Sequence, residues 1–184
     1  MVNKIFNKND FNSSDGMLTS VWGPSLWHSL HTISFNYPVK PTNEDKKNYY
    51  LFFKQLGKVL PCKYCRDNYI KNIQSVKLNK DTMKNRDTLS RWLYNLHEHI
   101  NTMLGKKSNL TYETIRERYE MFRARCLSDE QKNVPKTKKL KRENGCVKPL
   151  YGVKSKCIIK IVPKHTKCKT FNIDKKCILK KFTI

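Results

Sequence analysis

Hydrophobic residues recur at three- and four-residue steps through much of residues 19–122, which is the period of amphipathic α-helices. The most regular repeat ends at Gly105, a residue type that commonly closes helices. Its apolar positions are Leu89, Trp92, Leu93, Leu96, Ile100, Met103 and Leu104. The pattern therefore predicts a long amphipathic helix, the fourth in the chain, that ends near Gly105.

The first predicted helix begins at Thr19 or Ser20, has Pro24 in its first turn and runs to Asn36. Pro38 stops this helix, because proline disfavours helical backbone for the residue before it.

The second predicted helix begins near Thr42 and buries one apolar stripe, formed by Tyr49, Phe52, Phe53, Leu56 and Leu60. The third begins at Cys62 and is short. In it Tyr69 and Ile70 face the core before the polar stretch 71–81 takes over.

A fifth predicted helix begins at Asn109 or Thr111 and carries on one face Tyr112, Ile115, Tyr119, Phe122 and Cys126. Beyond it the helical pattern breaks up, and the basic run 136–142 is typical of a solvated linker. The pieces 157–162 and 177–180 are short and β-prone, so this part is either a degenerate strand repeat or disordered.

The predicted fold class is all-α, a four-helix bundle plus a short fifth helix, followed by a basic C-terminal extension with short β-prone pieces. We divide the chain into a polar lead-in over 1–18, a helical domain over 19–127, a basic linker over 128–145 and a Cys/Lys-rich extension over 146–184. The lead-in shows neither a helical nor a strand period.

The C-terminal part of the chain is much more basic than the rest. The net charge of the 184 residues is +23, and residues 133–184 hold 16 basic but only two acidic side chains. Such a segment favours non-specific binding of polyanions, including nucleic acid. No apolar run of 18 or more residues occurs and the N-terminus lacks the apolar core of a signal peptide, so we expect a soluble, cytoplasmic protein without a membrane anchor.

The candidate chemistry centres on the motif Leu60-Pro61-Cys62-Lys63-Tyr64-Cys65. The proline ends the preceding helix, so a new helix opens on the two cysteines. Its positive N-terminal end, with Lys63 and Arg66, favours thiolate over thiol. A C-x-x-C serves thiol–disulfide exchange and zinc binding equally well, and both remain open on the motif alone.

Two helices add side chains that a redox site could use. Trp27 and His31 lie four residues apart on one helix face, as do His97 and Asn101 on another. The alternative for Trp27 and His31 is a core tryptophan beside a satisfied buried histidine. His99 points about 200° away from His97, so both cannot join the two cysteines in one zinc site. A dithiol that is reoxidised needs an electron acceptor, and flavin held between helices fits that need.

At these residues the chain resembles the Erv/ALR family of FAD-linked sulfhydryl oxidases. The resemblance covers roughly residues 18–122 and rests on three stretches in the family's order. These are Trp22-Gly23-Pro24 through Trp27, Leu30 and His31 to Tyr37-Pro38, then Pro61-Cys62-x-x-Cys65, then Trp92-Leu93 with Leu96, His97, Ile100, Asn101, Leu104, Gly105 and Lys106.

The resemblance implies an FAD in a helical bundle, Cys65 against the isoalloxazine ring and Cys62 facing the substrate. It implies a homodimer and no metal. The implied cofactor contacts are Trp27, His31, His97 and Asn101, with Gly23, Pro24, Ser25 and Lys106 near the phosphate or ribose portions, and Tyr119 in the place of a frequent tryptophan.

The sequence departs from the family at several positions. Glu98 stands where the family has asparagine, and Leu60 where it has tyrosine. The structural disulfide of cellular members, which would pair the positions of Tyr94 and about Thr111, is absent. In these respects the chain looks like the members encoded by large cytoplasmic DNA viruses.

The sequence thus predicts an FAD-dependent thiol oxidase that forms disulfides in protein dithiols and passes electrons to oxygen, giving hydrogen peroxide. The alternative is a basic structural protein that binds polyanions or nucleic acid with its tail and uses the helical domain as a scaffold. For the tail cysteines, a structural or polyanion-binding role is preferred over an electron relay, because they are widely spaced. These are Cys146, Cys157, Cys168 and Cys177.

Overall fold

The computed structural model describes residues 7–127, 145–168 and 172–178. The chain forms two compact units, Met1–Ser108 and Asn109–Ile184, which are treated separately below. This division falls earlier than the predicted end of the helical domain at residue 127. The predicted basic linker lies almost wholly outside the described residues.

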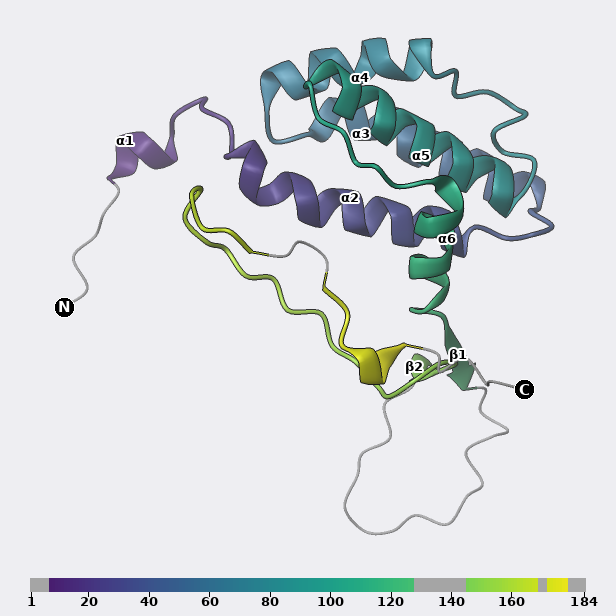
Figure 1. Ribbon diagram of the computed structural model, residues 1–184. Coiled ribbons are helices and arrows are strands. Elements are labelled where there is room, and N and C mark those ends of the chain that lie inside the picture. Colours follow the sequence, from purple (N-terminus) through teal and green to yellow (C-terminus); the bar gives the residue numbers. More distant parts are fainter. Residues whose placement is uncertain (1–6, 128–144, 169–171, 179–184) are drawn as a thin grey trace. The chain divides into compact units, whose positions relative to one another are not determined.

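Four long helices make up the first unit, as the sequence predicted (Figure 1). They are α2 (Thr19–Asn36), α3 (Asn43–Val59), α4 (Lys63–Ser75) and α5 (Arg86–Met103). Helix α5 packs against α2 and α4, and α4 also packs against α3. The predicted all-α bundle is confirmed for this unit.

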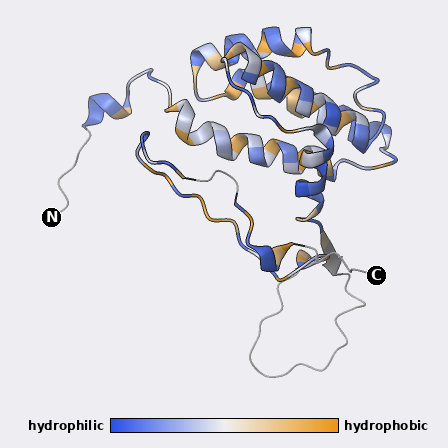
Figure 2. Cartoon of the chain, viewed as in Figure 1, coloured by the Kyte–Doolittle hydropathy of each residue, from blue (hydrophilic) through white to orange (hydrophobic). Residues whose placement is uncertain are grey.

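The core of the bundle consists of apolar side chains from all four helices and their connections. Figure 2 shows hydrophobic and hydrophilic residues interspersed along these helices, as amphipathic helices require. The buried cluster comprises Leu30, Tyr37, Phe53, Leu60, Tyr69, Met83, Leu89, Trp92, Leu93 and Leu96. Two buried tyrosines end in hydrogen bonds to backbone carbonyls, from Tyr37 to Met83 at 2.9 Å and from Tyr69 to Phe53 at 2.8 Å.

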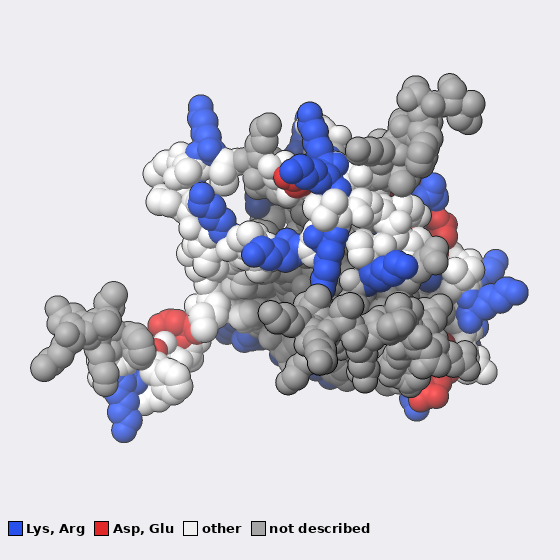
Figure 3. Space-filling model, turned by 90° about the horizontal axis from the view of Figure 1, so that it is seen from below, with Lys and Arg blue, Asp and Glu red and all other residues white. Residues whose placement is uncertain are grey.

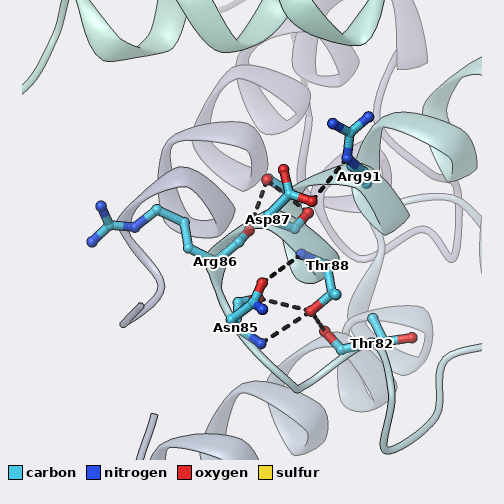
Figure 4. Close-up of polar contacts among 7 residues, drawn as sticks. Thr82, Asn85, Arg86, Asp87, Thr88 and Arg91 are labelled. Carbon is cyan, nitrogen blue, oxygen red and sulfur yellow. Dashed lines mark hydrogen bonds and ion pairs between the residues drawn. The ribbon is translucent and has the colours of Figure 1, made fainter. Parts of the chain in front are cut away.

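The start of α5 is fixed by a hydrogen-bonded cap (Figure 4). The Asn85 side chain accepts from the Thr88 backbone N–H at 3.0 Å, and the Asn85 N–H donates to the Thr88 hydroxyl oxygen at 3.0 Å. The Thr88 hydroxyl in turn reaches the Thr82 carbonyl at 3.0 Å. An Arg91–Asp87 ion pair at 2.9 Å spans one turn of the exposed surface. A capped first turn holds the helix in register with the core, and so positions the residues farther along it.

The lead-in differs from its prediction, because residues Lys8–Phe11 form the short helix α1. Asn7 and Asp10 make a capping box, with Asn7 accepting from two backbone N–H groups and Asp10 accepting from the Asn7 N–H. Local capping can supply a helical turn where no hydrophobic period exists. Pro24 also differs. Helix α2 begins at Thr19, as predicted, but Pro24 is its sixth residue and therefore lies beyond the first turn.

Several predicted core residues are exposed. Phe52 is next to the buried Phe53, and Ile70 is next to the buried Tyr69. Because successive helical residues point about 100° apart, Phe52 and Ile70 are turned toward the surface. Helix α4 is longer than predicted and ends at Ser75. Met103 and Leu104, in the last turn and at the C-cap of α5, are 56% and 61% exposed.

The second unit contains α6 (Tyr112–Glu120), the strands β1 (Ala124–Leu127) and β2 (Gly145–Pro149), and a 3₁₀ turn at Lys175–Cys177. The strands pair antiparallel, with Cys126 opposite Cys146. The prediction that Cys126 lies on a helix is therefore wrong, because β2 recruits this segment into a ladder. The β-prone piece 157–162 forms no strand.

Cys146 takes part in a disulfide, whereas Cys157, Cys168 and Cys177 carry free thiols. In the described part of the chain, no helix is long and apolar enough to cross a membrane. Figure 3 shows one face of the molecule, on which Lys and Arg side chains are far more extensive than Asp and Glu side chains.

Candidate active site

The two cysteines of the C-x-x-C motif stand at the start of α4, as the sequence predicted. Cys62 is the N-cap residue, and its Sγ accepts a hydrogen bond from the Cys65 backbone N–H at 3.3 Å. Arg66 donates from Nη1 to the Leu60 carbonyl at 2.6 Å, which holds the turn between α3 and α4. Both cysteines are half-buried and carry free thiols.

The two thiols differ in acidity. Hydrogen bonds from the Cys65 side chain and backbone lower the pKa of the Cys62 thiol. Burial raises the pKa of the Cys65 thiol, the adjacent Cys62 adds to the rise, and a hydrogen bond with Thr19 opposes it. Cys62 is therefore the first of the pair to become a thiolate, the form that exchanges with disulfides.

Three aromatic rings meet between α2 and α5. The rings of Trp27 and His97 are stacked, with centroids 3.9 Å apart and an interplanar angle of 5°. His31 Nε2 lies 3.1 Å from His97 Nδ1, so one imidazole donates to the other. His31 is 4% exposed, and its ring centroid is 6.2 Å from that of Trp27. The packing of α2 on α5 thus brings these three side chains together, and their role as cofactor contacts stays a prediction.

Both histidines are neutral near pH 7. Burial, together with the charges of His97 and His28, lowers the pKa of His31 to about 3. Burial also lowers the pKa of His97 to about 4, with Glu98 opposing and the Lys106 ammonium adding to the effect. Neutral imidazoles keep one ring nitrogen as an acceptor, which the His31–His97 hydrogen bond requires.

Asn101 is held one turn beyond His97 by Glu98. Its Nδ2 donates to Glu98 Oε1 at 2.9 Å, and the Ser108 hydroxyl donates to Glu98 Oε2 at 2.9 Å. Gly105 adopts a positive φ of 64°, which turns the chain so that the Lys106 N–H returns to the Asn101 carbonyl at 2.8 Å. The departure at Glu98 therefore has a structural role: it ties the end of α5 to the segment that follows.

The other residues predicted to contact the cofactor lie elsewhere on α2 and in the second unit. Gly23 is buried, Pro24 exposed and Ser25 half-buried, all on the N-terminal half of α2 before Trp27. Tyr119 is buried in the second unit, whose position relative to the first is not defined, so its role as a cofactor contact stays a prediction. Among the described residues, no three His, Cys, Asp or Glu side chains are grouped as a metal site.

Two residues near the site were not predicted to serve it. Glu98 appeared only as a departure from the family pattern, although an i, i+3 spacing to Asn101 could have suggested their hydrogen bond. Thr19 appeared only as a helix start, yet its hydroxyl lies 3.9 Å from Cys65 Sγ. No local sequence signal could have linked two residues that are 46 positions apart.

The bundle and its dithiol define a class of helical redox proteins, and a family model identifies which one. The model of the Erv1/Alr family matches residues 24–120, just over half of the chain. The chain belongs to the Erv1/Alr family. The match includes the dithiol motif, the Trp27–His31 pair and all of α5.

Individual relatives agree with the family assignment. The chain is 38% identical over 91 residues to a protein of Acanthamoeba polyphaga mimivirus named "Probable FAD-linked sulfhydryl oxidase R368", covering 50% of this chain and 63% of the relative. It is 30% identical over 84 residues to the mitochondrial FAD-linked sulfhydryl oxidase ERV1 of Saccharomyces cerevisiae, covering 46% of this chain and 43% of the relative. The chain thus spans less than two thirds of these relatives.

A solved structure supports the fold. The crystal structure of the FAD binding domain of Erv1 from Saccharomyces cerevisiae aligns with a TM-score of 0.51 and 26% sequence identity, covering 56% of this chain and 94% of that one. The comparisons give no support to the alternative function of a polyanion-binding protein with the bundle as scaffold.

Proposed function

We propose that the chain is an FAD-dependent thiol oxidase, which makes disulfides in protein dithiols and uses oxygen as the electron acceptor, with hydrogen peroxide as product. The observation that carries the proposal is a C-x-x-C dithiol at a helix start in a bundle of the Erv1/Alr family. The family membership and the names of its sulfhydryl oxidase relatives support the activity.

The residues between α2 and α5 fit a planar cofactor. Trp27 and His97 supply aromatic rings, and both histidines are neutral, so a heteroaromatic ring meets no buried charge there. In this proposal Trp27, His31, His97 and Asn101 hold the rings of FAD. The N-terminal half of α2 with Gly23, Pro24 and Ser25, together with Lys106 and Tyr119, serves its remaining parts.

The chemistry of the dithiol follows from the unequal thiols. In the oxidised pair, a substrate thiolate attacks Sγ of Cys62, the N-cap residue of α4. The Cys62–Cys65 bond breaks, and its electron pair leaves on Cys65 Sγ. A second substrate thiolate then displaces Cys62, which releases the substrate disulfide and leaves both cysteines reduced. When bound, FAD accepts two electrons from a dithiol and passes them to oxygen.

The proposed substrates are proteins with paired cysteines, and the proposed assembly is a homodimer. Both follow from family membership. A cytoplasmic location remains a prediction from the sequence. The basic charge of residues 133–184 supports binding of polyanions as an accessory property, not as the main function.

The direct test of the activity is oxygen consumption by the full chain supplied with a small dithiol. We expect hydrogen peroxide to form in a ratio of about one to each oxygen consumed. Cys65→Ser should abolish turnover, whereas Cys157→Ser, at an exposed free thiol of the second unit, should not. If the full chain binds FAD but consumes no oxygen with any dithiol, the proposed function is wrong.

A further inference from the structure

The segment just before α2 forms a strap across the dithiol motif. We define the strap as residues 16–19. The Met17 N–H donates to the Pro61 carbonyl at 2.8 Å, and the Trp22 indole N–H donates to the Met17 carbonyl at 3.0 Å. These two bonds connect the backbone before Cys62 to the first turn of α2.

The strap also approaches the motif too closely for a larger residue. A Cβ added at Gly16 would lie 2.7 Å from the Pro61 carbonyl oxygen and 3.3 Å from Cys62 Cα. A real Cβ does not come that close to a backbone oxygen. Glycine at position 16 therefore allows the strap to lie directly against the turn that carries the cysteines.

The strap ends at Thr19, the first residue of α2. Its Oγ1 lies 3.9 Å from Cys65 Sγ, within hydrogen-bonding distance for sulfur. The cysteines stand at the start of α4, so the N-terminal turns of two helices, α2 and α4, adjoin the same thiol pair. Helix N-termini favour negative charge, which agrees with a thiolate at this place.

We propose that Thr19 is the polar partner of the reacting sulfur of Cys65: its hydroxyl donates a hydrogen bond to the thiolate that Cys65 becomes when the Cys62–Cys65 disulfide is opened. The inference rests on the proposed redox role of the pair and adds a residue to it. The pull of the Thr19 hydroxyl on the pKa of Cys65, against the effect of burial, supports the assignment.

The hydrogen bond acts in a balanced step. A substrate thiolate forms a bond to Cys62 Sγ, and the bond between Cys62 Sγ and Cys65 Sγ breaks. The electron pair of the broken bond stays on Cys65 Sγ as a thiolate, and no proton moves. Thr19 keeps its proton throughout and stabilises the negative sulfur. A stabilised leaving thiolate leaves faster, and it makes the pair easier to reduce.

The test is the equilibrium of the Cys62–Cys65 pair with glutathione in the full chain, kept under anaerobic conditions at alkaline pH, where reduced Cys65 is a thiolate. The reaction is quenched with acid, free thiols are alkylated, and the peptide that contains both cysteines is quantified by mass spectrometry. In Thr19→Val, which keeps the shape and removes the hydroxyl, we expect the disulfide form to be favoured about three- to tenfold more, where tenfold corresponds to about 30 mV.

Two further variants make the result specific. Thr19→Ser keeps a hydroxyl and should remain within about twofold of the wild-type equilibrium, below the change expected for one lost hydrogen bond. Thr32→Val is the matched control, because the Thr32 hydroxyl on the same helix bonds to the His28 carbonyl at 2.9 Å. It should also leave the equilibrium unchanged. The inference would be overturned if Thr19→Val had the wild-type equilibrium. It would also be overturned if Thr19→Ser shifted the equilibrium as far as Thr19→Val does.

Gly16→Ala serves as a second probe if Thr19→Val loses helical circular dichroism. It leaves Thr19 intact and displaces the strap, because the new Cβ cannot fit beside Pro61. We expect a shift in the same direction as in Thr19→Val, and an unshifted equilibrium in a folded Gly16→Ala protein would contradict the inference. The equilibrium needs neither oxygen nor turnover, so its outcome is distinct from a failure of the proposed oxidase activity.

Discussion

Trp27 of α2 and His97 of α5 lie parallel, with ring centroids 3.9 Å apart and planes inclined by 5°. The two residues are separated by most of the bundle in sequence, and the packing of α2 on α5 brings them together. We propose that the rings of FAD are held beside this contact, because aromatic side chains pack well on planar ligands.

The first prediction concerns those rings. Trp27→Ala and His97→Ala should each weaken FAD binding about tenfold or more, since each removes an aromatic face. The measurement is the dissociation constant of FAD, followed by flavin fluorescence during titration of the protein stripped of cofactor. His99→Ala, on the same helix but pointing away from His97, is the control and should bind FAD as the wild type does. Equal affinity in all three variants would place the cofactor elsewhere.

The second prediction concerns acid stability. His31 and His97 have pKa values of about 3 and about 4 in the folded chain, below the ordinary value of 6.5. The unfolded chain therefore binds more protons between these values, so stability is full above pH 6.5 and falls as the pH drops toward 4. For His31 the loss amounts to about 3 kcal/mol by pH 4.

Denaturant unfolding at a series of pH values measures this loss. The double variant His31→Gln/His97→Gln removes both imidazoles and should show a flatter dependence between pH 6.5 and 4 than the wild type. Other titrating groups affect both proteins alike, so the difference between the two curves isolates the histidines. Parallel curves would mean that the imidazoles are not buried in the neutral form.

The third prediction separates the two cysteines. Cys62→Ser and Cys65→Ser should each abolish oxidation of protein thiols and keep the fold, because both side chains are only half-buried at a helix start. Their colours should differ. If Cys65 is the thiol beside the flavin, Cys62→Ser shows a long-wavelength charge-transfer absorption and Cys65→Ser does not. The opposite pattern would exchange the assigned roles.

Helix content was predictable from the sequence because hydrophobic period and capping residues are local signals. The Thr42 cap, the glycine at 105 and the stripe with Leu89, Leu93 and Leu96 gave the right elements. The hydrophobic period did not show which of two adjacent aromatic or apolar residues is buried. Phe52 is exposed and Phe53 is buried, and period alone cannot decide between neighbours at the edge of a stripe.

The second unit was harder to predict for a different reason. Cys126 continues the apolar face of a helix in the sequence, but its segment pairs with Gly145–Pro149, a partner distant in the chain. Non-local strand pairing overrides a weak helical period. The same limit applies to the site: the motif identified Cys62 and Cys65, whereas the approach of Thr19 depends on how the strap crosses the turn.

The fourth prediction concerns the basic tail. Truncation after residue 132 should leave FAD content and activity on a small dithiol intact, because the family match ends at residue 120. The measurements are the flavin-to-protein absorbance ratio and the rate of oxygen consumption. Replacing the exposed cysteines Cys157 and Cys168 with serine in the full chain tests a relay separately. A large loss with protein substrates alone would show that the tail carries electrons.

The fifth prediction is the most direct test of the account: the visible absorption spectrum of the purified full chain, before and after addition of a dithiol without oxygen. We expect a yellow protein with about one FAD per chain, whose flavin absorption disappears on adding the dithiol and returns on admitting air. Cys65→Ser should be yellow but should keep its absorption under the dithiol. A folded wild-type protein that is colourless and cannot be loaded with FAD, or a flavin that the dithiol does not reduce, would contradict the assignment of this site as a thiol oxidase.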